Sequence, residues 1–358
     1  MPALDLTATS VDLTRTICDI PSVSGDETRL ADLMHDAVSA LPHLDVYRDG
    51  DTIVARTHGG RAQRVAIAGH IDTVPINANV PTRDIEIEGE PHIWGRGTVD
   101  MKAGVAVQLK LAAELADPRV DITWMWYDHE EVDADLNGLT RLARTRPDLF
   151  AADFAILGEP SNGHVEGGCN GNLRAIVRLD GVRAHSARAW VGENAIHKAA
   201  PVLTRLAEYR PRDIAVEGLV YREGLNAVRI GGGVAGNVIP DLCEIEVNYR
   251  FAPSRDAEEA ERHVRDVFSG FEVDVVDLAV GARPGLDAPL AQEFVAAVRA
   301  EPRPKYGWTD VARFSALGVP AVNYGPGDPH LAHHDEERVP VAQIEAVERG
   351  LRAWLTAG

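Results

Sequence analysis

The chain has 358 residues, which suggests about two domains, and 45% of them are hydrophobic, enough to bury a sizeable core. Its 55 acidic residues outnumber its 36 Lys and Arg residues and give a formal charge of -19. That charge repels phosphate backbones and disfavours nucleic acid as a partner, whereas it attracts metal cations. An acidic substrate would need a local group of arginines.

Cysteine usage and the N-terminal sequence favour a reducing compartment. Cys18, Cys169 and Cys243 are far apart and form no C-x-x-C pair, so they do not indicate a disulfide scaffold. Asp5 and Asp12 lie where a signal peptide has a basic start and an apolar core. No apolar run approaches the ~18 residues that span a bilayer. We therefore expect a cytoplasmic protein that binds no membrane.

Strand-like and helix-like patterns alternate through the first part of the chain. Arg64–Ala68 is a short apolar run between glycines, and Lys102–Ala116 has the pattern of a helix that ends before a proline. Two further strands are predicted at Asp121–Tyr127 and Asp153–Leu157, with a helical stretch near Gly138–Arg144 between them. This alternation predicts an α/β sheet with helices on its faces.

The pattern changes from about residue 172. There the predicted order becomes β-α-β-β-α-β, which is the split βαβ pattern of a ferredoxin-like domain. The six predicted elements are Leu173–Asp180, Asn194–Tyr209, Ala227–Ile230, Leu242–Phe251, Ala257–Phe268 and Phe271–Leu278.

The α/β pattern resumes after this inserted segment. A buried strand is predicted at Val319–Tyr324 and a closing helix at Val341–Leu355. We therefore expect one α/β domain in two parts, 1–171 and 285–358, that is interrupted by a smaller domain at 172–284.

Residues that can bind metal follow the predicted strands of the α/β domain. They are His70, Asp72, Asp100, Glu130, Glu131, Glu159 and His333. Because the carboxyl ends of parallel strands share one edge of a sheet, residues far apart in sequence can meet there. Imidazole and carboxylate suit Zn²⁺, and two histidines with three carboxylates are enough for two ions if one carboxylate bridges.

The spacing within two of these motifs suggests a division of roles. In His70-x-Asp72 the aspartate is placed to accept the second N–H of the imidazole and to fix the tautomer that binds metal. Glu130 and Glu131 are adjacent, so on a strand they cannot point the same way. One of them would bind metal while the other acts as a base.

Each feature has an ordinary alternative explanation. A lone His-x-Asp is more often a structural pair, an aspartate beside a helix start is usually an N-cap, and adjacent glutamates are usually solvated. The combination is harder to explain this way, because all four predicted strand ends carry a metal-binding residue type in a loop framed by Gly or Pro.

Other motifs give weaker signals. The segment 231–236 fits the G-x-G-x-x-G pattern of dinucleotide-binding oxidoreductases, but Asn237 and Val238 follow it in place of a helix, so we interpret it as a β-turn. Cys169 lies beside glycines, where an ordinary loop cysteine is a better explanation than a thiol nucleophile. Trp124 and Trp126 share one face of a strand, as core residues do.

The motifs GHIDTVP, GRGTVDMKAG, YDHEE, LGEPS and AHHDEERV together resemble the M20 family of di-zinc amidohydrolases and peptidases, and the resemblance runs over essentially the whole chain. It implies a zinc-peptidase-like catalytic domain with a mixed, largely parallel sheet, interrupted by a smaller ferredoxin-like α+β dimerisation domain. Such an enzyme would hold two Zn²⁺ per subunit, with Co²⁺ as a substitute, and would form a homodimer through the inserted domain.

The resemblance also implies roles for single residues. Asp100 would bridge the two ions, with His70 and Glu159 on one and Glu131 and His333 on the other. His333 is preferred to its neighbour His334 because the family places this histidine four residues before a glutamate, here Glu337. The remaining roles fall to the general base Glu130, the orienting residue Asp72, the oxyanion donor His185 from the partner subunit, and the substrate-binding residues Asn237 and Arg250.

Longer blocks, AHSARAWVGENAIHKA, GGGVAGNVIPD, NYRFAP and KYGWTDVARFSALGVPAVNYGPGDP, are similar to the actinobacterial branch of this family that acts on N-succinyl-LL-2,6-diaminopimelate. They imply hydrolysis of that amide to succinate and LL-diaminopimelate. Deacetylation of acetylornithine, an aminoacylase or dipeptidase activity, and a non-catalytic binding protein on the same scaffold are the alternatives. The segment 167–172 lacks an expected arginine, so Arg174, Arg188 and Arg250 are the candidates for binding the succinyl carboxylate.

Overall fold

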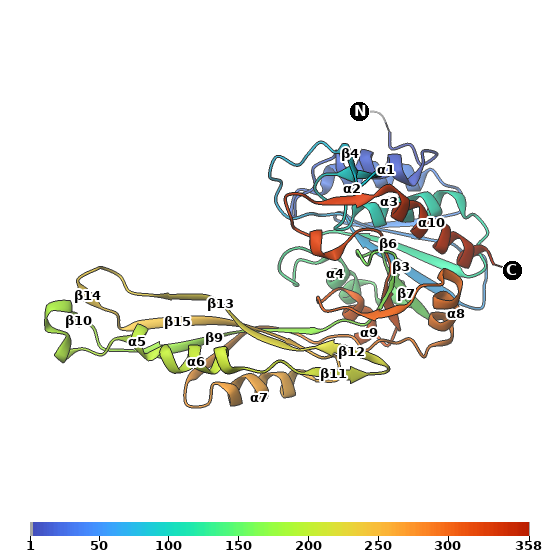
Figure 1. The fold of residues 1–358 in the computed structure, drawn as a ribbon. Coiled ribbons are helices and arrows are strands. Elements are labelled where there is room, and N and C mark those ends of the chain that lie inside the picture. Colours follow the sequence, from blue (N-terminus) through green and yellow to red (C-terminus); the bar gives the residue numbers. More distant parts are fainter. Residues whose placement is uncertain (1–2, 358) are drawn as a thin grey trace. The chain divides into compact units, whose positions relative to one another are not determined.

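The computed structural model describes residues 3–357, which form two compact units (Figure 1). The first unit contains the residues up to 167, 284–303 and those from 313 onward, and the second contains 168–283 and 304–312. Residues 304–312, which the sequence division places with the closing part of the α/β domain, therefore pack within the second unit.

The first unit is built on an eight-stranded sheet in the order β1-β2-β6-β3-β7-β18-β8-β17. The four central strands, β6, β3, β7 and β18, are parallel, and antiparallel strands flank them. The strands are β1 (Asp45–Asp49), β2 (Thr52–Arg56), β3 (Arg64–His70), β6 (Asp121–Tyr127), β7 (Phe154–Leu157), β8 (Val165–Gly167), β17 (Pro302–Pro304) and β18 (Ala321–Asn323). The predicted mixed, largely parallel sheet is confirmed.

Helices cover both faces of this sheet. Figure 1 shows α1, α3 and α10 along one side of the strands and α4 and α9 on the other. Every residue of β6 is buried, as a strand covered on both faces requires. The helices of this unit are α1 (Ser10–Cys18), α2 (Thr28–Ser39), α3 (Lys102–Glu114), α4 (Gly138–Thr145), α8 (Pro289–Val298), α9 (Val311–Ala316) and α10 (Val341–Thr356), with the short 3₁₀ segments η1 (Pro147–Phe150) and η3 (Pro329–Leu331). The first two residues of α9 pack with the second unit.

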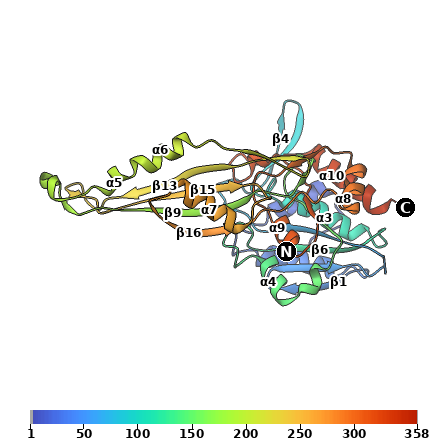
Figure 2. The same cartoon turned by 90° about the horizontal axis from the view of Figure 1, so that it is seen from below.

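A small three-stranded sheet completes the first unit. It contains β4 (Arg83–Ile87), β5 (Glu90–Trp94) and β19 (Arg338–Pro340), in the order β19-β5-β4 (β4 is labelled in Figure 2). β19 pairs antiparallel with β5, and Arg338 lies opposite Trp94. The loop that follows β5 and the loop that leads into β19 therefore meet the sheet side by side.

The second unit has a four-stranded antiparallel sheet in the order β13-β15-β9-β16. One face packs on the helices, because alternate residues of β9 and β15 are buried in a core shared with α6 and α7. The elements are β9 (Gly171–Asp180), α5 (Ala195–Lys198), α6 (Ala200–Glu208), β13 (Gly224–Gly232), β15 (Leu242–Phe251), α7 (Ala257–Val267) and β16 (Glu272–Ala279). The predicted β-α-β-β-α-β order is confirmed.

Two small ladders extend the second unit, one of β10 (Ala184–His185) with β14 (Val238–Ile239) and one of β11 (Asp213–Val216) with β12 (Leu219–Arg222). The 3₁₀ segment η2 (Ser186–Val191) follows β10.

The helix predicted at Asn194–Tyr209 is divided into α5 and α6. Asn194 caps α5 by accepting the backbone N–H groups of Ile196 and His197. Pro201 lies in the first turn of α6, where its missing N–H has no partner to lose, so the helix restarts there. Among residues 3–357, none of the helices has both the length and the apolar character needed to span a bilayer.

Candidate metal centre

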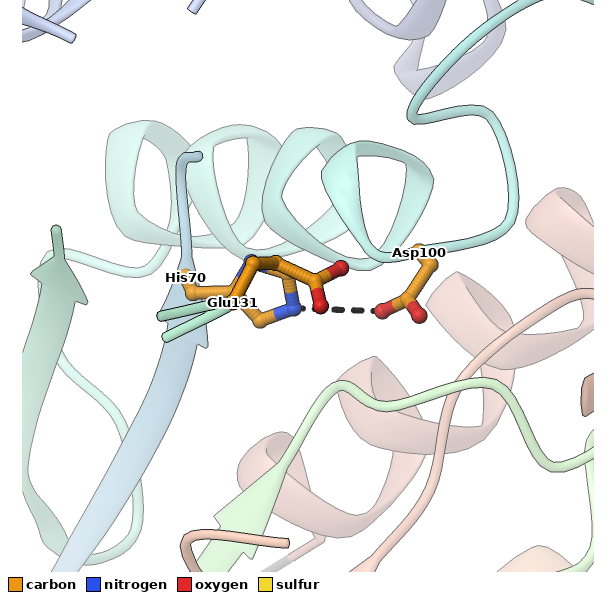
Figure 3. Close-up of side chains that lie close together, drawn as sticks. All are labelled: His70, Asp100 and Glu131. Carbon is orange, nitrogen blue, oxygen red and sulfur yellow. Dashed lines mark hydrogen bonds and ion pairs between the residues drawn. The ribbon is translucent and has the colours of Figure 1, made fainter. Parts of the chain in front are cut away.

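Ligand-type residues gather at the carboxyl end of the parallel strands in the first unit. His70 is the last residue of β3, Glu131 follows β6 and Glu159 follows β7, while Asp100 precedes α3. The possible ligand atoms of His70, Asp100 and Glu131 lie within 4.8 Å of one another (Figure 3). The structure thus brings together residues that the sequence separates, at the edge where parallel sheets bind ligands.

Asp100 is placed beside the strand ends by the start of α3. The N-cap of this helix is Met101, which makes no side-chain cap hydrogen bond, so Asp100 is not consumed as a helix cap. A Cβ on Gly104 would lie 2.2 Å from the carbonyl oxygen of Gly158, so only glycine lets α3 approach the loop that carries Glu159.

The buried Lys102 fixes the other side of the same turn. Its Nζ donates to the carbonyl oxygens of Ile17 and Ile20, at 3.2 and 2.9 Å, where α1 ends. Burial lowers the pKa of Lys102 to about 8. The side chain therefore anchors the turn that carries Asp100 to a neighbouring helix.

The two carboxylate oxygens of Asp100 face different histidines. Oδ1 lies 3.1 Å from Nε2 of His70, and Oδ2 lies 3.4 Å from Nε2 of His333. Glu159 is on the His70 side at 3.9 Å, and Glu131 is on the His333 side at 3.0 Å. Asp100 is therefore shared between two His–carboxylate pairs, which we name the His70 half (His70, Glu159) and the His333 half (His333, Glu131).

The cluster is electrostatically suited to a cation. Burial by itself would raise the pKa of Asp100, but the hydrogen bonds from His333 and His70 outweigh it and lower that pKa. Hydrogen bonds to Asp100 and Glu131 raise the pKa of His333 to about 10. Burial opposes charging of His70, yet its bonds to Asp100 and Asp72 hold its pKa well above the usual value. The carboxylates thus strongly favour positive charge between them.

The carboxylate of Asp72 holds the turn that follows β6. It is fully buried and accepts the backbone N–H groups of Glu130 and Glu131, at 3.0 and 3.1 Å, and the Ser24 hydroxyl at 2.6 Å. The acceptor nearest to Nδ1 of His70 is the backbone carbonyl of Asp72 at 3.0 Å, whereas its carboxylate is 3.4 Å away. The orienting contact expected from the carboxylate is therefore shared with the main chain.

Glu130 and Glu131 lie in a turn beyond β6 and not on the strand itself. His129, which precedes them, has a positive φ of 59°, and its backbone N–H donates to the buried carboxylate of Glu27 at 3.2 Å. Because both glutamates lie in this turn, the alternation of a strand does not determine the directions of their side chains. Glu131 joins the His333 half, and the charge of Glu130 helps to raise the pKa of His70.

His185, Asn237 and Arg250 lie in the second unit. His185 is exposed, its Nδ1 accepts the backbone N–H of Ala187 at 3.0 Å, and the carbonyl of Asn237 accepts the N–H of Ser186 at 2.9 Å. Nε of Arg250 donates to Asn248 at 3.2 Å. No carboxylate among residues 3–357 lies within ion-pair distance of Arg250, although burial lowers its pKa.

Sequence reasoning gave no role to several residues that support this centre. Ser24 and Glu27 belong to an N-terminal Ser-Gly-Asp-Glu segment. The Ser24 hydroxyl donates to Asp72, and Glu27 accepts the backbone N–H of His129 in the turn that carries Glu131. Arg96 forms a buried ion pair at 2.9 Å, beside Asp100, with Glu337, which the motif used only to select His333. The local signal in each case is a charged or polar residue in a glycine-containing loop, which is common and does not point to a particular partner.

The weaker motifs have structural explanations. Gly231 and Gly232 end the strand β13, and no helix follows them. Cys169 is fully buried, and burial raises the pKa of its thiol to about 11, which is unsuited to a nucleophile. Trp124 and Trp126 stack in the core with ring centroids 6.3 Å apart.

Comparison with known proteins identifies the family. The model of the peptidase family M20/M25/M40 matches residues 66–357. The chain belongs to this family. A Mycobacterium tuberculosis protein that carries the name DapE is 51% identical over 355 residues, covering 98% of this chain and 99% of the relative. A Corynebacterium glutamicum protein named succinyl-diaminopimelate desuccinylase is 47% identical over 366 residues, covering 99% and 98%.

Solved structures share the fold of this M20 chain. A tripeptidase from Staphylococcus aureus has a TM-score of 0.76 at 20% identity, covering 99% of this chain and 98% of that one. An M20 family metallo-carboxypeptidase from Sulfolobus solfataricus has a TM-score of 0.76 at 17% identity, covering 97% and 98%.

Together, the family match and the His, Asp and Glu cluster make the protein a metal-dependent hydrolase. The donor set of imidazole nitrogens and carboxylate oxygens fits a borderline metal ion such as Zn²⁺.

Proposed function

We propose that the protein hydrolyses the amide bond of N-succinyl-LL-2,6-diaminopimelate to succinate and LL-diaminopimelate, a step of lysine and diaminopimelate biosynthesis. The names of its relatives at 51% and 47% identity support this reaction. The observation that carries the proposal is the division of the two Asp100 oxygens between the His70 half and the His333 half, at 3.1 and 3.4 Å.

The same geometry supports a centre for two metal ions, Zn²⁺ by preference, with Co²⁺ able to replace it. Asp100 would bridge, the His70 half would complete one site and the His333 half the other. The arrangement fits because each half offers one imidazole and one carboxylate beside the shared aspartate, within hydrogen-bonding or ion-pair distance. A cation placed there replaces the protons that the raised histidine pKa values otherwise retain.

Bound zinc supplies two effects, because it makes water easier to deprotonate and it polarises the carbonyl of a bound amide. The remaining work falls to side chains. Glu130 would accept the proton of the attacking water and later return it to the leaving amine. Asp72 accepts the backbone N–H of Glu130 at 3.0 Å and lies beside Nδ1 of His70, so it would hold the general base Glu130 and the ligand His70 in fixed relative positions.

The tautomer of His185 suits a donor to the developing oxyanion. Because its Nδ1 accepts the N–H of Ala187 at 3.0 Å, the neutral ring carries its proton on Nε2. The side chain is exposed at the end of β10, where His185 is the N-cap of η2, so Nε2 can reach a molecule outside its own unit. We assign it to the active site of the partner subunit, where it would stabilise the tetrahedral intermediate.

Arg250 and Asn237 are proposed to bind the substrate. Arg250 is a half-buried guanidinium without an ion-paired carboxylate among residues 3–357, so an anionic substrate would supply the missing charge. Arg174 is a weaker candidate for the succinyl carboxylate, because it already contacts Asp277 at 3.3 Å and Glu246 at 3.8 Å. A planar guanidinium suits carboxylates because it can bind both oxygens.

A homodimer through the second unit is part of the proposal. β13 is an edge strand of its sheet, and its apolar residues Val228 and Ile230 are 57% and 49% exposed. Ile196 and Leu203, on the neighbouring helices α5 and α6, are also exposed. An unprotected apolar edge with adjacent apolar helices is the kind of surface that pairs with a second copy.

The deciding experiment compares substrates. Zinc-loaded protein should hydrolyse N-succinyl-LL-2,6-diaminopimelate with a higher kcat/KM than N-acetylornithine, and a chelator should abolish the activity. A preference for the acetyl substrate would instead make the protein another M20 amidohydrolase. Absence of hydrolysis of any N-acyl amino acid, with metal bound, would favour a binding protein on the same scaffold.

Subunit exchange tests the dimer and His185 together. His185→Ala alone and Glu130→Gln alone should each be nearly inactive, and mixing them should restore part of the activity, because one site of each mixed dimer would be intact. Failure of the mixture to recover activity, with mixed dimers demonstrated, would place His185 in its own subunit or outside the reaction.

A further inference from the structure

The shared ligand Asp100 and the ligand His333 both lie in loops outside the helices and strands. Asp100 lies in the loop after β5, and His333, with a positive φ of 64°, lies in the loop before β19. The antiparallel pairing of β5 with β19 brings the two loops together at their bases. It does not by itself hold the tips of the loops, where the ligands lie.

Glu337 links the two loops directly. Its carboxylate is fully buried, and Oε1 accepts the backbone N–H groups of Val99 and of Asp100 itself, at 2.8 and 3.0 Å. Its carbonyl oxygen also accepts the N–H of Gly95 at 2.9 Å. Glu337 is only four residues after His333, at the end of the loop that carries this histidine. The same residue therefore binds the main chain of Asp100 and belongs to the loop of His333.

Arg96 completes the link. Its guanidinium is 4% exposed, and Nη1 donates to Oε2 of Glu337 at 2.9 Å and to the carbonyl oxygen of His334 at 3.3 Å. The arginine of the Asp100 loop therefore binds the main chain beside His333, while the glutamate of the His333 loop binds the main chain of Asp100. The contacts are reciprocal, and both charged groups are compensated by each other.

We propose that the Arg96–Glu337 pair is a positioning device that sets the distance between Asp100 and His333, and through it the metal affinity of the His333 half. This inference rests on the proposed two-metal centre. Glu337 accepts the backbone N–H of Asp100, and Arg96 donates to the carbonyl oxygen of His334, so the pair acts on both ligands through the main chain. Partners of this outer kind typically change metal affinity by about 10- to 100-fold when removed.

The effect should be unequal between the halves. His70 is the last residue of β3 and its Nδ1 faces Asp72, whereas the side chain of His333 is 56% exposed and its residue lies in the loop that Arg96 and Glu337 hold. Loosening the pair should therefore weaken the His333 half and leave the His70 half nearly unchanged. A purely structural role would instead lower overall stability without changing one metal site more than the other.

Glu337→Gln tests this because the amide oxygen can still accept from Val99 and Asp100 while the ion pair with Arg96 is lost. Stepwise titration of the metal-free variant with Co²⁺ should show one affinity near that of the wild type and one weakened about 10- to 100-fold. The visible absorption of the weaker Co²⁺ site should shift, and kcat should fall more than KM rises. Glu337→Asp, which keeps the charge but shortens the reach, should show a smaller change of the same kind.

Glu223→Gln is the matched control. Glu223 is equally buried, is ion-paired with Arg255 at 2.6 Å and with Arg212 at 3.1 Å, and accepts the N–H of Ala252 at 3.2 Å, all within the second unit. It should cost stability but leave both Co²⁺ affinities and the spectrum unchanged.

Equal Co²⁺ affinities in Glu337→Gln and wild type, or equal weakening in the Glu223→Gln control, would overturn the inference. If Glu337→Gln does not fold, an unchanged titration of Glu337→Asp overturns it. In all of these cases, hydrolysis by wild-type protein with two metals bound would leave the proposed function standing.

Discussion

The two halves of the candidate metal centre have the same residue types but differ in how they are held. His70 and Glu159 have side chains that are 1% and 6% exposed, and His70 is the last residue of a central strand. His333 is 56% exposed and lies in a loop at a positive φ of 64°. A ligand at a strand end is placed by the sheet itself, whereas a loop ligand depends on contacts that reach it from elsewhere.

The pKa values of His70 and His333 are shifted in the same direction but for different leading reasons. Both histidines have raised pKa values, so both halves favour positive charge. For His70 the carboxylates act against a large burial penalty, whereas for His333 the bonds to Asp100 and Glu131 are the leading cause. Because His70 is buried at a strand end whereas His333 is exposed in a loop, we infer that the His70 half is organised without metal and that the His333 half is ordered by metal binding.

The largest expected effect comes from a residue that belongs to neither half. Glu130→Gln should leave metal binding at both halves intact and lower kcat by roughly 10²- to 10⁴-fold, the scale of general-base removal. Metal analysis and steady-state kinetics on the same preparation check this. Near-normal turnover would reject Glu130 as the base, and loss of metal would show that it is a ligand.

Replacing each histidine in turn should lower the free energy of unfolding by different amounts in the two halves. In metal-free protein, His70→Ala leaves buried carboxylates without their partner and should lower the free energy of unfolding by about 3 to 5 kcal/mol. His333→Ala also removes a partner of Asp100 and Glu131, but the lost side chain is 56% exposed and its ion pairs are screened by water, so it should change that free energy by only about 0 to 1 kcal/mol. Urea unfolding measures both. Equal losses would mean that the two halves are equally organised.

The smallest expected effect is the dependence of metal affinity on pH. A histidine with a raised pKa retains its proton up to that pH, so a metal must displace the proton in order to bind. Affinity should therefore increase with pH by about tenfold per unit for each proton displaced. The His333 contribution should end near its pKa of about 10. Competition titrations with a chelator at several pH values would show this, and a flat profile would contradict it.

Sequence reasoning was strongest where the local pattern dictates the backbone. The strands at Asp121–Tyr127 and Leu242–Phe251 were predicted with the bounds that the structure shows, because alternation and apolar runs determine which residues a sheet can bury. It was weaker around residues 194–209, where Pro201 divides one predicted helix into two.

By itself, the sequence determined which residue types stand at the ends of the parallel strands. Since those ends share one edge, it also determined that histidines and carboxylates would gather there. Only the tertiary structure decided that Asp100 is no helix cap, that its two oxygens face different histidines, and that Glu337 binds its backbone from 237 residues away. Propensity and periodicity act over a few neighbouring residues, whereas the spacing of two loops depends on the packed chain between them.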